Sequence, residues 1–435
     1  MNALWTRTVA FFTSLKLTIV CLAFSMVLIV VGTLDQVNLG IYHAQKTYFD
    51  TFFVWWQPAG GGFKLPILPG GWLLGSLLLA NLLAAHFSRF TLGWWRLLVV
   101  IGVLAAQTWI ILAVGYQGWL LLLFLIMDVA LAFYVELRLK WQKLGITITH
   151  FGIILLLVGG LLTTLLSVES QMRIDTGQTV HYSESIRDTE LAIIDRSAPE
   201  HDQVIAIPQS LLANNEVIKD EKLPFEIRVK QFMPNSNMGR RAEGDTQPSL
   251  ATAGLGPRFA VTEVPMAVKM DERDFPSAFI ELTKDGKSLG TYLASLWFTL
   301  AVPSPQIVEV DGKSYDVQIR PRRYYKPFSL KLLKFTHERY TGTQIPKDFA
   351  SQVQLKDATN NEDREVRIFM NNPLRYGGLT FYQASFANND KTTILQVVRN
   401  PNWVLPYIAC TLVSLGLLVQ FTSHLMKFNK RRAAA

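Results

Sequence analysis

The sequence predicts a membrane α-helical bundle with six transmembrane helices, joined to a large, mainly-β domain outside the cytoplasm. Half of the 435 residues are hydrophobic, yet the mean hydropathy of +0.22 is too low for a chain that is all bundle. Residues 167–401 are polar, with the alternating pattern of strands. The apolar residues are concentrated in six predicted spans, each close to the length that crosses a bilayer: Leu15–Leu34, Gly71–Arg89, Leu97–Val114, Trp119–Glu136, Ile146–Leu166 and Trp403–Thr422.

The distribution of cations predicts the orientation of these spans. Residues 167–401 hold 29 Lys/Arg and 30 Asp/Glu, so the net charge of +8 belongs to the membrane part and does not indicate nucleic-acid binding. Of the 13 remaining cations, only Lys46 and Lys64 lie on the outer side. The positive-inside rule therefore places both termini in the cytoplasm and residues 167–401 outside. The eleven inner cations are Arg7, Lys16, Arg89, Arg96, Arg138, Lys140, Lys143, Lys427, Lys430, Arg431 and Arg432.

This pattern divides the chain into three regions. Residues 1–166 form a membrane region with five spans and an external loop at 35–70, and residues 167–401 form the exported β domain. Residues 402–435 hold the last span and a basic cytoplasmic tail. The first span leads into Gly32-Thr-Leu-Asp35 without a small-x-small cleavage site, so we expect it to remain as an anchor.

The exported domain is predicted to be a β-sandwich or layered sheet. Lys284-Asp-Gly and Val310-Asp-Gly supply hairpin turns, and Met233–Pro257, rich in Gly, Ser, Asn, Pro and charges, is predicted to be a mobile loop. Gly and Pro in Tyr340–Ser351 and Asn371–Gln383 indicate structural turns. The predicted strands are Thr189–Asp195, Gln203–Pro208, Phe225–Phe232, Ala278–Thr283, Ser314–Arg320, Ser351–Leu355, Glu365–Met370 and Thr392–Val398.

Several classes of soluble enzyme are excluded by what the sequence lacks. There is no Walker loop, no Gly-x-Gly-x-x-Gly after a strand, no His-Glu-x-x-His and no Gly-x-Ser-x-Gly. The two cysteines, Cys21 and Cys410, both fall inside predicted spans. The exported domain therefore has no disulfide, no Cys-x-x-Cys pair and no thiol metal site, which excludes a thioredoxin-like role.

Two groups of polar residues in the exported domain are predicted to have mainly structural or surface roles. His181, His201 and His337 are scattered without ligand spacing, so we expect surface or packing roles. A basic cluster is predicted to be mostly a solvated face, although contact with lipid headgroups or with haem propionates also fits it. Its members are Arg320, Arg322, Arg323, Lys326, Lys331 and Lys334, interleaved with Tyr324, Tyr325 and Phe328.

Two histidines in the membrane region point to a haem or proton site. His86 lies close to the cytoplasmic end of its span, and His150 lies near the start of another. A neutral imidazole is a good iron ligand, and an ionisable group at that depth is costly. His86 either ligates iron, marks the membrane boundary or bonds to a neighbouring helix. Asp128 is expected as a neutral or paired carboxyl, and Asn81 and Gln107 as interhelical hydrogen-bonding residues.

Four stretches of the chain carry distinctive motifs. They are Leu15-Lys-Leu-Thr-Ile-Val through Gly32-Thr-Leu-Asp-Gln36, the His86 helix, Tyr340-Thr-Gly-Thr-Gln-Ile-Pro-Lys-Asp-Phe-Ala-Ser351, and Met370-Asn-Asn-Pro-Leu-Arg-Tyr-Gly-Gly-Leu-Thr-Phe-Tyr-Gln383, which leads into Arg399-Asn-Pro401. Taken in this order, they resemble the ResB family of system II cytochrome c biogenesis proteins. That family usually has three spans before the exported domain, whereas this chain has five, and the extra pair at 97–136 has no assigned role.

The resemblance implies haem delivery for covalent attachment to apocytochrome c outside the bacterial cytoplasmic membrane. It implies transient binding of haem b, a multi-span CcsA/ResC-like partner as a separate polypeptide, and a subunit of a haem lyase complex that is not catalytic alone. His86 matches the family's membrane histidine, and the second axial ligand comes from the partner or from His150. Both a part in bond formation and a purely haem-holding role fit this resemblance.

A competing hypothesis is a non-enzymatic assembly or sensor protein. Its exported β domain would bind a partner, and its spans would serve only as anchors in the lipid bilayer. A pure anchor has no need of His86, so the two hypotheses differ in whether the purified protein is coloured by haem. A transporter is a third hypothesis, but inverted repeats and paired broken helices are not evident.

Overall fold

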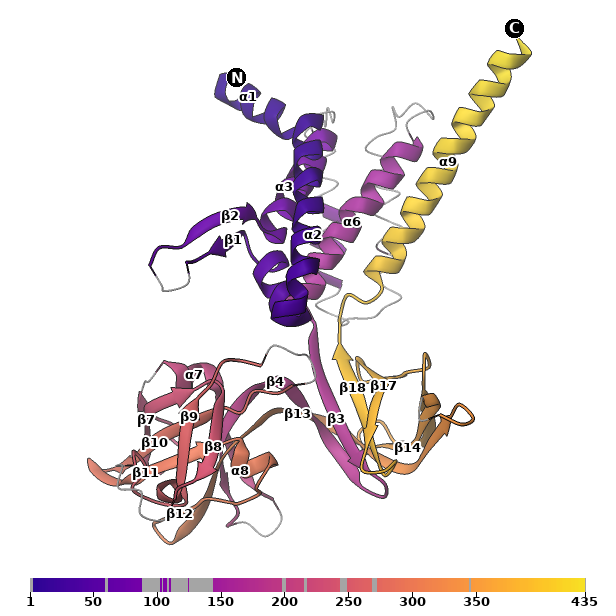
Figure 1. Ribbon diagram of the computed structural model, residues 1–435. Helices are drawn as coiled ribbons and strands as arrows, with labels where there is room; N and C mark the ends of the chain where they lie inside the picture. The colour runs from indigo at the N-terminus through magenta and orange to yellow at the C-terminus, as the bar shows by residue number, and fades with distance from the viewer. Residues whose placement is uncertain are drawn as a thin grey trace. The chain divides into compact units, whose positions relative to one another are not determined.

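The computed structural model describes two compact units. The helical unit comprises Met1–Ser167 and Asn400–Ala435, and the sheet unit comprises Val168–Arg399 (Figure 1). The described residues are 3–58, 62–87, 102, 103, 105–107, 109, 110, 124, 144–197, 201–214, 217–242, 249–267, 272–343 and 346–434.

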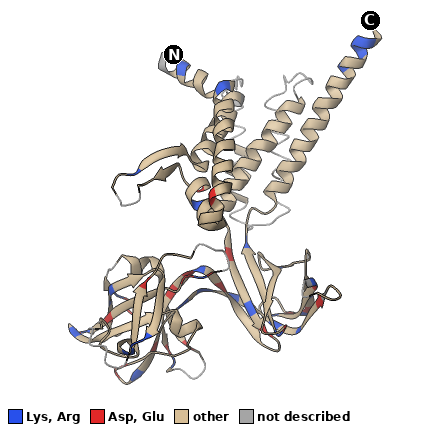
Figure 2. Cartoon of the chain, in the orientation of Figure 1, with Lys and Arg blue, Asp and Glu red and all other residues tan. Residues whose placement is uncertain are grey.

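Within its described residues, the helical unit contains three helices that are long and apolar enough to cross a membrane: Leu15–Phe49, Leu144–Leu166 and Leu405–Ala433. Together with the β-rich sheet unit, they confirm the coarse fold class, and Figure 2 shows few charges along the helices between their ends. The predicted spans at 97–114 and 119–136 lie almost entirely outside the described residues, so six spans are not shown. The helices are α1 (Ala3–Phe12), α2 (Leu15–Ala44), α3 (Gly71–Phe87), α6 (Leu144–Leu166) and α9 (Leu405–Ala433).

The segment at 35–70, predicted as an external loop, is largely ordered secondary structure. Helix α2 continues through it to Ala44 with a kink at Gly40, whose φ is 70°, and a π-helical turn follows at Gln45–Phe49. Strands β1 (Phe53–Trp56) and β2 (Leu65–Pro69) then form an antiparallel hairpin. Asp35, the first residue of the predicted loop, lies within α2, and its Oδ2 accepts a 2.9 Å hydrogen bond from Tyr48.

Asn81 acts as the predicted interhelical hydrogen-bonding residue. Its Nδ2 donates to the carbonyl oxygens of Phe12 (2.7 Å) and Ser14 (3.1 Å), and its Oδ1 accepts a 2.7 Å bond from Thr18. These bonds from α3 satisfy backbone groups left free where α1 ends and α2 begins. Because its side chain is buried, Asn81 fixes the α1–α2 corner against α3.

Helices α6 and α9 pack closely through small residues. Gly145, Gly152 and Gly159 recur every seven residues on α6, facing Ala409 and Gly416 on α9. A Cβ added at Gly152 would lie 2.9 Å from the Ala409 carbonyl oxygen, and one at Gly416 would lie 2.6 Å from the Thr149 nitrogen. Such close backbone approach is a common basis of helix association in membranes. Lipid tails are as apolar as the side chains of a helix, so the hydrophobic effect does not drive association there.

The sheet unit is built on one large antiparallel sheet and two smaller ones. The large sheet has the order β15-β14-β13-β4-β3-β18-β17-β16, with β12 beside β13 and β5 beside β4. A second sheet has the order β11-β10-β7-β6, and β8 pairs with β9. The strands are β3 (Val168–Asp175), β4 (Thr179–Asp195), β5 (Gln203–Pro208), β6 (Val217–Ile218), β7 (Glu226–Met233), β8 (Ser236–Arg240), β9 (Phe259–Glu263), β10 (Ser277–Lys284), β11 (Lys287–Ser295), β12 (Ile307–Val310), β13 (Lys313–Arg339), β14 (Pro346–Asp357), β15 (Glu362–Phe369), β16 (Leu374–Tyr376), β17 (Leu379–Ala387) and β18 (Thr392–Arg399).

Two long strands, β4 and β13, run through both hydrophobic cores of this unit (Figure 1). One core contains Leu191 and Ile319 and is covered by the second sheet, with the short helices α7 (Gln209–Ala213) and α8 (Trp297–Leu300) nearby. The other core contains Val180 and Leu330 with residues of β14 to β18. The sequence predicted only part of each long strand, since charged residues interrupt their alternation.

The predicted turns and loop have different outcomes. Asp285-Gly286 and Asp311-Gly312 have positive φ and close the β10–β11 and β12–β13 hairpins, which confirms both turn predictions. The stretch Met233–Pro257 is interrupted by strand β8, so the predicted loop is too long. The composition of this stretch did not reveal β8 because β8 pairs with β9, which lies beyond the stretch. Residues 243–248 lie outside the described part of the chain.

The α6–α9 contact predicts a position-specific cost for large side chains. We expect Gly152→Leu to lower the melting temperature of the purified protein in detergent, because Val413 and the Ala409 carbonyl leave no room for it. Gly160→Leu on the same helix is the control, since nothing lies within 4 Å of a Cβ there. Equal melting temperatures for the two variants would contradict the role given to this interface.

Candidate functional site

The structure places both predicted membrane histidines on helices of the helical unit. His86 lies one residue before the end of α3, and its side chain lies outside the described residues. His150 lies in the second turn of α6 and is half-buried. Asp128 also lies outside the described residues. The roles of His86 and His150 as haem ligands stay predictions.

The two histidine-bearing helices contact each other. Figure 1 shows α3 and α6 running in opposite directions, so the last turn of α3 and the first turns of α6 lie toward the same end of the pair. No charged residue occurs between Gly71 and His86. Both helices are apolar and each carries one histidine, a residue type that can ligate haem iron.

Part of the predicted basic cluster is buried, so its interpretation as a solvated face was wrong for those residues. The Arg320 side chain is only 2% exposed, and its Nε donates to Glu190 Oε1 at 2.9 Å. Arg323 donates to Glu184 Oε1 at 3.0 Å. Each pair joins directly opposite residues of β13 and β4, a geometry that the sequence alone did not reveal. Lys331 and Lys334 are exposed, as predicted.

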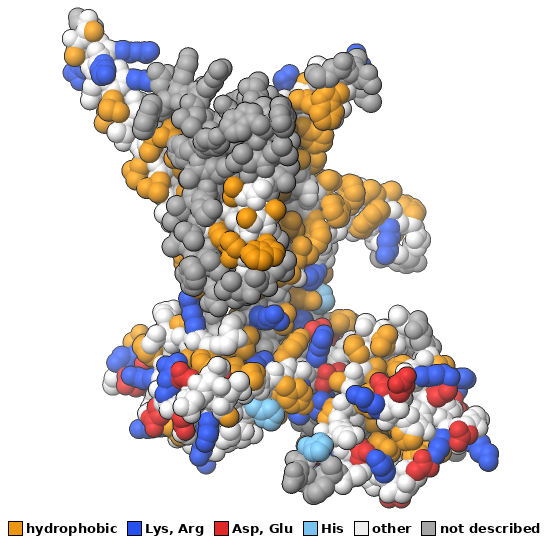
Figure 3. Space-filling view, turned by 180° about the vertical axis from the view of Figure 1, so that it is seen from behind, with side chains coloured by type: hydrophobic (Ala, Val, Ile, Leu, Met, Phe, Trp, Pro, Cys, Tyr) orange, Lys and Arg blue, Asp and Glu red, His pale blue; other side chains and the backbone are white. Residues whose placement is uncertain are grey.

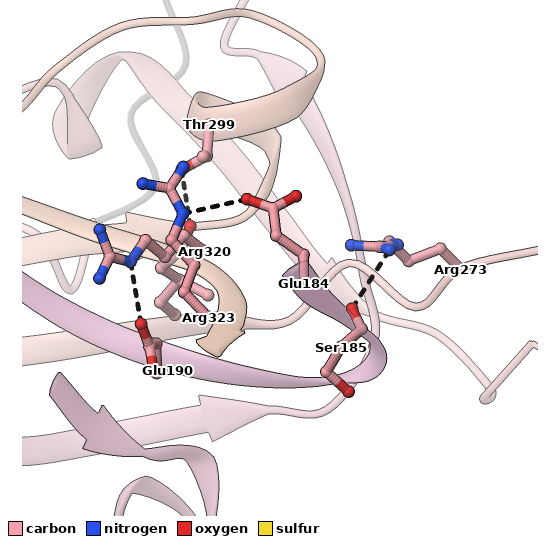
Figure 4. A network of polar contacts seen from close by, with 8 residues as sticks. Glu184, Ser185, Glu190, Arg273, Thr299, Arg320 and Arg323 are labelled. Carbon is pink, nitrogen blue, oxygen red and sulfur yellow. Dashed lines mark hydrogen bonds and ion pairs between the residues drawn. The ribbon is translucent and has the colours of Figure 1, made fainter. Parts of the chain in front are cut away.

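A large bulge separates the two ion pairs. Pro321 lies opposite Thr189 and Arg323 lies opposite Glu184, so residues 185–188 of β4 face a single residue of β13. Ser185 Oγ accepts a 3.0 Å bond from the Asp188 nitrogen and closes this bulge. Figure 4 shows Arg273 beside Ser185, with Arg273 Nη2 donating a 3.4 Å hydrogen bond to the Ser185 carbonyl oxygen. In the same view, Glu184 and Glu190 face their arginine partners. The bulge lies between the residues of the two cores.

Two tyrosines, Tyr182 and Tyr324, and a further cation, Lys326, lie beside the two Arg–Glu pairs. The guanidinium of Arg323 lies 4.2 Å from the centre of the Tyr182 ring, a cation–π contact. Lys326 Nζ donates to the Tyr324 carbonyl oxygen at 2.9 Å, and among the described residues no carboxylate pairs with it. Burial, and next the charge of Arg399, lower the pKa of Lys326 to about 8. This position can attract an anion.

The side chain of His337 is buried, a feature that nothing in the surrounding sequence indicated. Its side chain is 2% exposed, its Nδ1 lies 2.9 Å from Asp390 Oδ1, and its ring lies 4.3 Å from that of Phe386. Among the described residues, its Nε2 has no hydrogen-bond partner. The pair links β13 to the β17–β18 turn, where Asn388, Asn389 and Asp390 all have positive φ. This arrangement fits the packing role predicted for the exported histidines.

A cavity of about 230 Å³ lies beside the start of β13. Asp316 lines it, with Oδ2 accepting a 2.9 Å bond from Arg196 and Oδ1 buried without a partner in the described part of the chain. Burial raises the pKa of this carboxyl. Within the described ranges, no group of three His, Cys, Asp or Glu side chains could hold a metal ion.

Comparison with known proteins shows a family match in one segment of the chain. Residues 304–394 match the model of the ResB-like family. The predicted resemblance to the ResB family is thereby confirmed. Protein NrfI of Wolinella succinogenes is similar, with 38% identity over 109 residues. That match covers 25% of this chain and 12% of the relative, so the chain spans a small part of that relative's length.

The ResB-like segment, residues 304–394, contains the arginine of each Arg–Glu pair. It contributes Arg320 and Arg323 from β13, as well as both His337 and Asp390. Their carboxylate partners on β4, together with His86 and His150, lie outside the segment.

The Arg320–Glu190 pair predicts a measurable difference between buried and exposed ion pairs. Glu190→Gln leaves the Arg320 charge buried without compensation, and we expect it to lower the free energy of unfolding of the sheet unit by about 3 kcal/mol. Glu362→Gln, which removes the partner of Arg364 in an exposed pair, should cost less than about 1 kcal/mol. Urea titration of the full-length protein compares the two, and equal losses would contradict the assignment.

Proposed function

We propose that this chain is the ResB-like subunit of a membrane complex that delivers haem for covalent attachment to apocytochrome c outside the cytoplasmic membrane. The observation that carries the proposal is the ResB-like segment. It supplies most strands of the large sheet in a chain whose other unit contains long apolar helices. The proposed partner is a CcsA/ResC-like multi-span protein on a separate chain.

In this proposal, the helical unit holds haem b transiently in the inner half of the bilayer. When bound, haem would supply an iron atom that imidazole nitrogens can ligate. His86 would provide one ligand from the last turn of α3, and the partner, or alternatively His150, would provide the other. The apolar sequence of α3 would exclude water from the macrocycle.

The orientation proposed for the chain follows from its charges. Basic residues at 427–432 continue α9 to its end at Ala433, which fits a helix that leaves the membrane on the cytoplasmic side. The sheet unit then lies outside, where apocytochrome c is modified. Because Lys326 has no carboxylate partner among the described residues, it is a candidate contact for a propionate or another carboxylate of the client complex.

Replacing His86 tests the proposal. His86→Ala should insert and fold normally, because alanine is the best helix former, yet it should lose most of its co-purifying haem and lower cytochrome c maturation. His424→Ala is the control, since His424 is exposed on α9 and its Nε2 lies 2.7 Å from Gln420. Added imidazole should partly restore maturation by filling the vacant axial position.

The haem content and absorption spectrum of the purified variants decide between the hypotheses. A His86→Ala protein with wild-type haem content and spectrum would make His86 a structural residue and would contradict the proposed ligation. A loss of haem equal to that of His424→Ala would have the same meaning, because it would assign the effect to general destabilisation of the bundle.

A further inference from the structure

The β1–β2 hairpin of the helical unit exposes apolar side chains on both faces. Along its two strands, only Val54 is buried. Lys64 is the single charged residue between Thr51 and Phe87. Figure 3 shows the hairpin as a projection covered mainly by hydrophobic side chains. The large exposed side chains are Phe53, Trp55, Trp56, Phe63, Leu65 and Ile67, which are between 42% and 63% exposed.

The base of the hairpin is fixed to the helices. The Gly70 nitrogen donates to the Phe52 carbonyl oxygen at 2.8 Å, and the Trp72 nitrogen donates to that of Thr51 at 3.1 Å. Val54 packs into a core that includes Leu28 of α2 and Leu74 of α3. Figure 1 shows the strands projecting sideways from these helices. The hairpin is therefore a rigid element held at the start of α3.

Neither water nor the hydrocarbon core suits this hairpin. In water, an isolated two-stranded hairpin is marginally stable, and one with apolar residues on both faces invites aggregation. In hydrocarbon, the outer edges of the two strands would leave backbone N–H and C=O groups without partners, since the sheet has only these two strands. The headgroup layer offers both apolar contact and water, and Trp is enriched there.

The edges of the hairpin disfavour coverage by a strand of another protein. Pro66 and Pro69 remove two N–H groups from β2, and a register shift between Val54 and Trp55 distorts β1. Prolines and bulges are the features by which natural edge strands resist pairing. Lipid, which needs no strand register, is the occupant that fits these edges.

The level of the hairpin agrees with a membrane surface. It leaves the bundle where α3 begins, which is an outer helix end in the predicted orientation. Trp403 and Tyr407 mark the corresponding end of α9, and both are exposed. We propose that the β1–β2 hairpin lies flat in the outer headgroup layer of the bilayer, with its tryptophans and Lys64 in contact with phospholipid. This proposal goes beyond haem handling and does not depend on it.

Site-directed spin labelling of the full-length protein tests this proposal. Cys21 and Cys410 are replaced by serine, and single cysteines are introduced at Trp55, Phe63 or Ile67 in phosphatidylcholine nanodiscs. Val27, exposed midway along α2, is the control for hydrocarbon, and Lys356, exposed on β14, is the control for water. Oxygen enters the hydrocarbon preferentially, whereas a nickel chelate remains in water, so the ratio of their collision rates reports depth.

We expect the three hairpin labels to show collision ratios between those of the two controls. Nickel accessibility equal to that at Lys356 would place the hairpin in water and overturn the proposal. Low accessibility to both reagents would indicate coverage by protein and would also overturn it. Because Trp55→Cys removes an aromatic ring, Phe63→Cys and Ile67→Cys give independent measurements if that variant fails to fold.

Discussion

The close contact between α6 and α9 is the constraint on which the packing of the helical unit depends. In the sequence, α6 precedes the whole sheet unit and α9 follows it. A Cβ added at Gly152 of α6 would lie 2.9 Å from the Ala409 carbonyl oxygen of α9, and one at Gly145 would lie 2.7 Å from the Gly416 carbonyl oxygen. The facing glycines therefore allow the backbones of two helices that are distant in the sequence to come into contact.

Within the sheet unit, the corresponding constraint is the bulge between β4 and β13. It lies between the two hydrophobic cores, with buried or half-buried Arg–Glu pairs on either side. Each arginine pairs with the glutamate directly opposite it, which favours this register of β4 and β13, although Arg320 Nη2 has no hydrogen-bond partner among the described residues. The chemistry proposed for the chain therefore rests on the helical unit, where imidazoles occur on apolar helices, while the sheet unit supplies the ResB-like surface.

The sequence predicted those features that depend on local pattern and missed those that depend on pairing. Hydropathy identified α6 within two residues, and Asp-Gly pairs located two turns, because burial in lipid and positive φ act locally. It missed the burial of Arg320 and the His337–Asp390 contact, because each requires a partner more than 50 residues away. It missed the length of β13 because charged residues interrupt the alternating pattern of that strand. It missed the β1–β2 hairpin because Gly and Pro there resemble loop composition.

Absorption spectroscopy of the wild-type protein tests the central claim most directly. The chain is purified from membranes alone and together with its CcsA/ResC-like partner, and the haem extracted into acidified acetone is compared with the protein content. Our account predicts a Soret band and non-covalently bound haem b, with more haem per protein when the partner is present. A colourless protein in both preparations would contradict the claim that this chain binds haem.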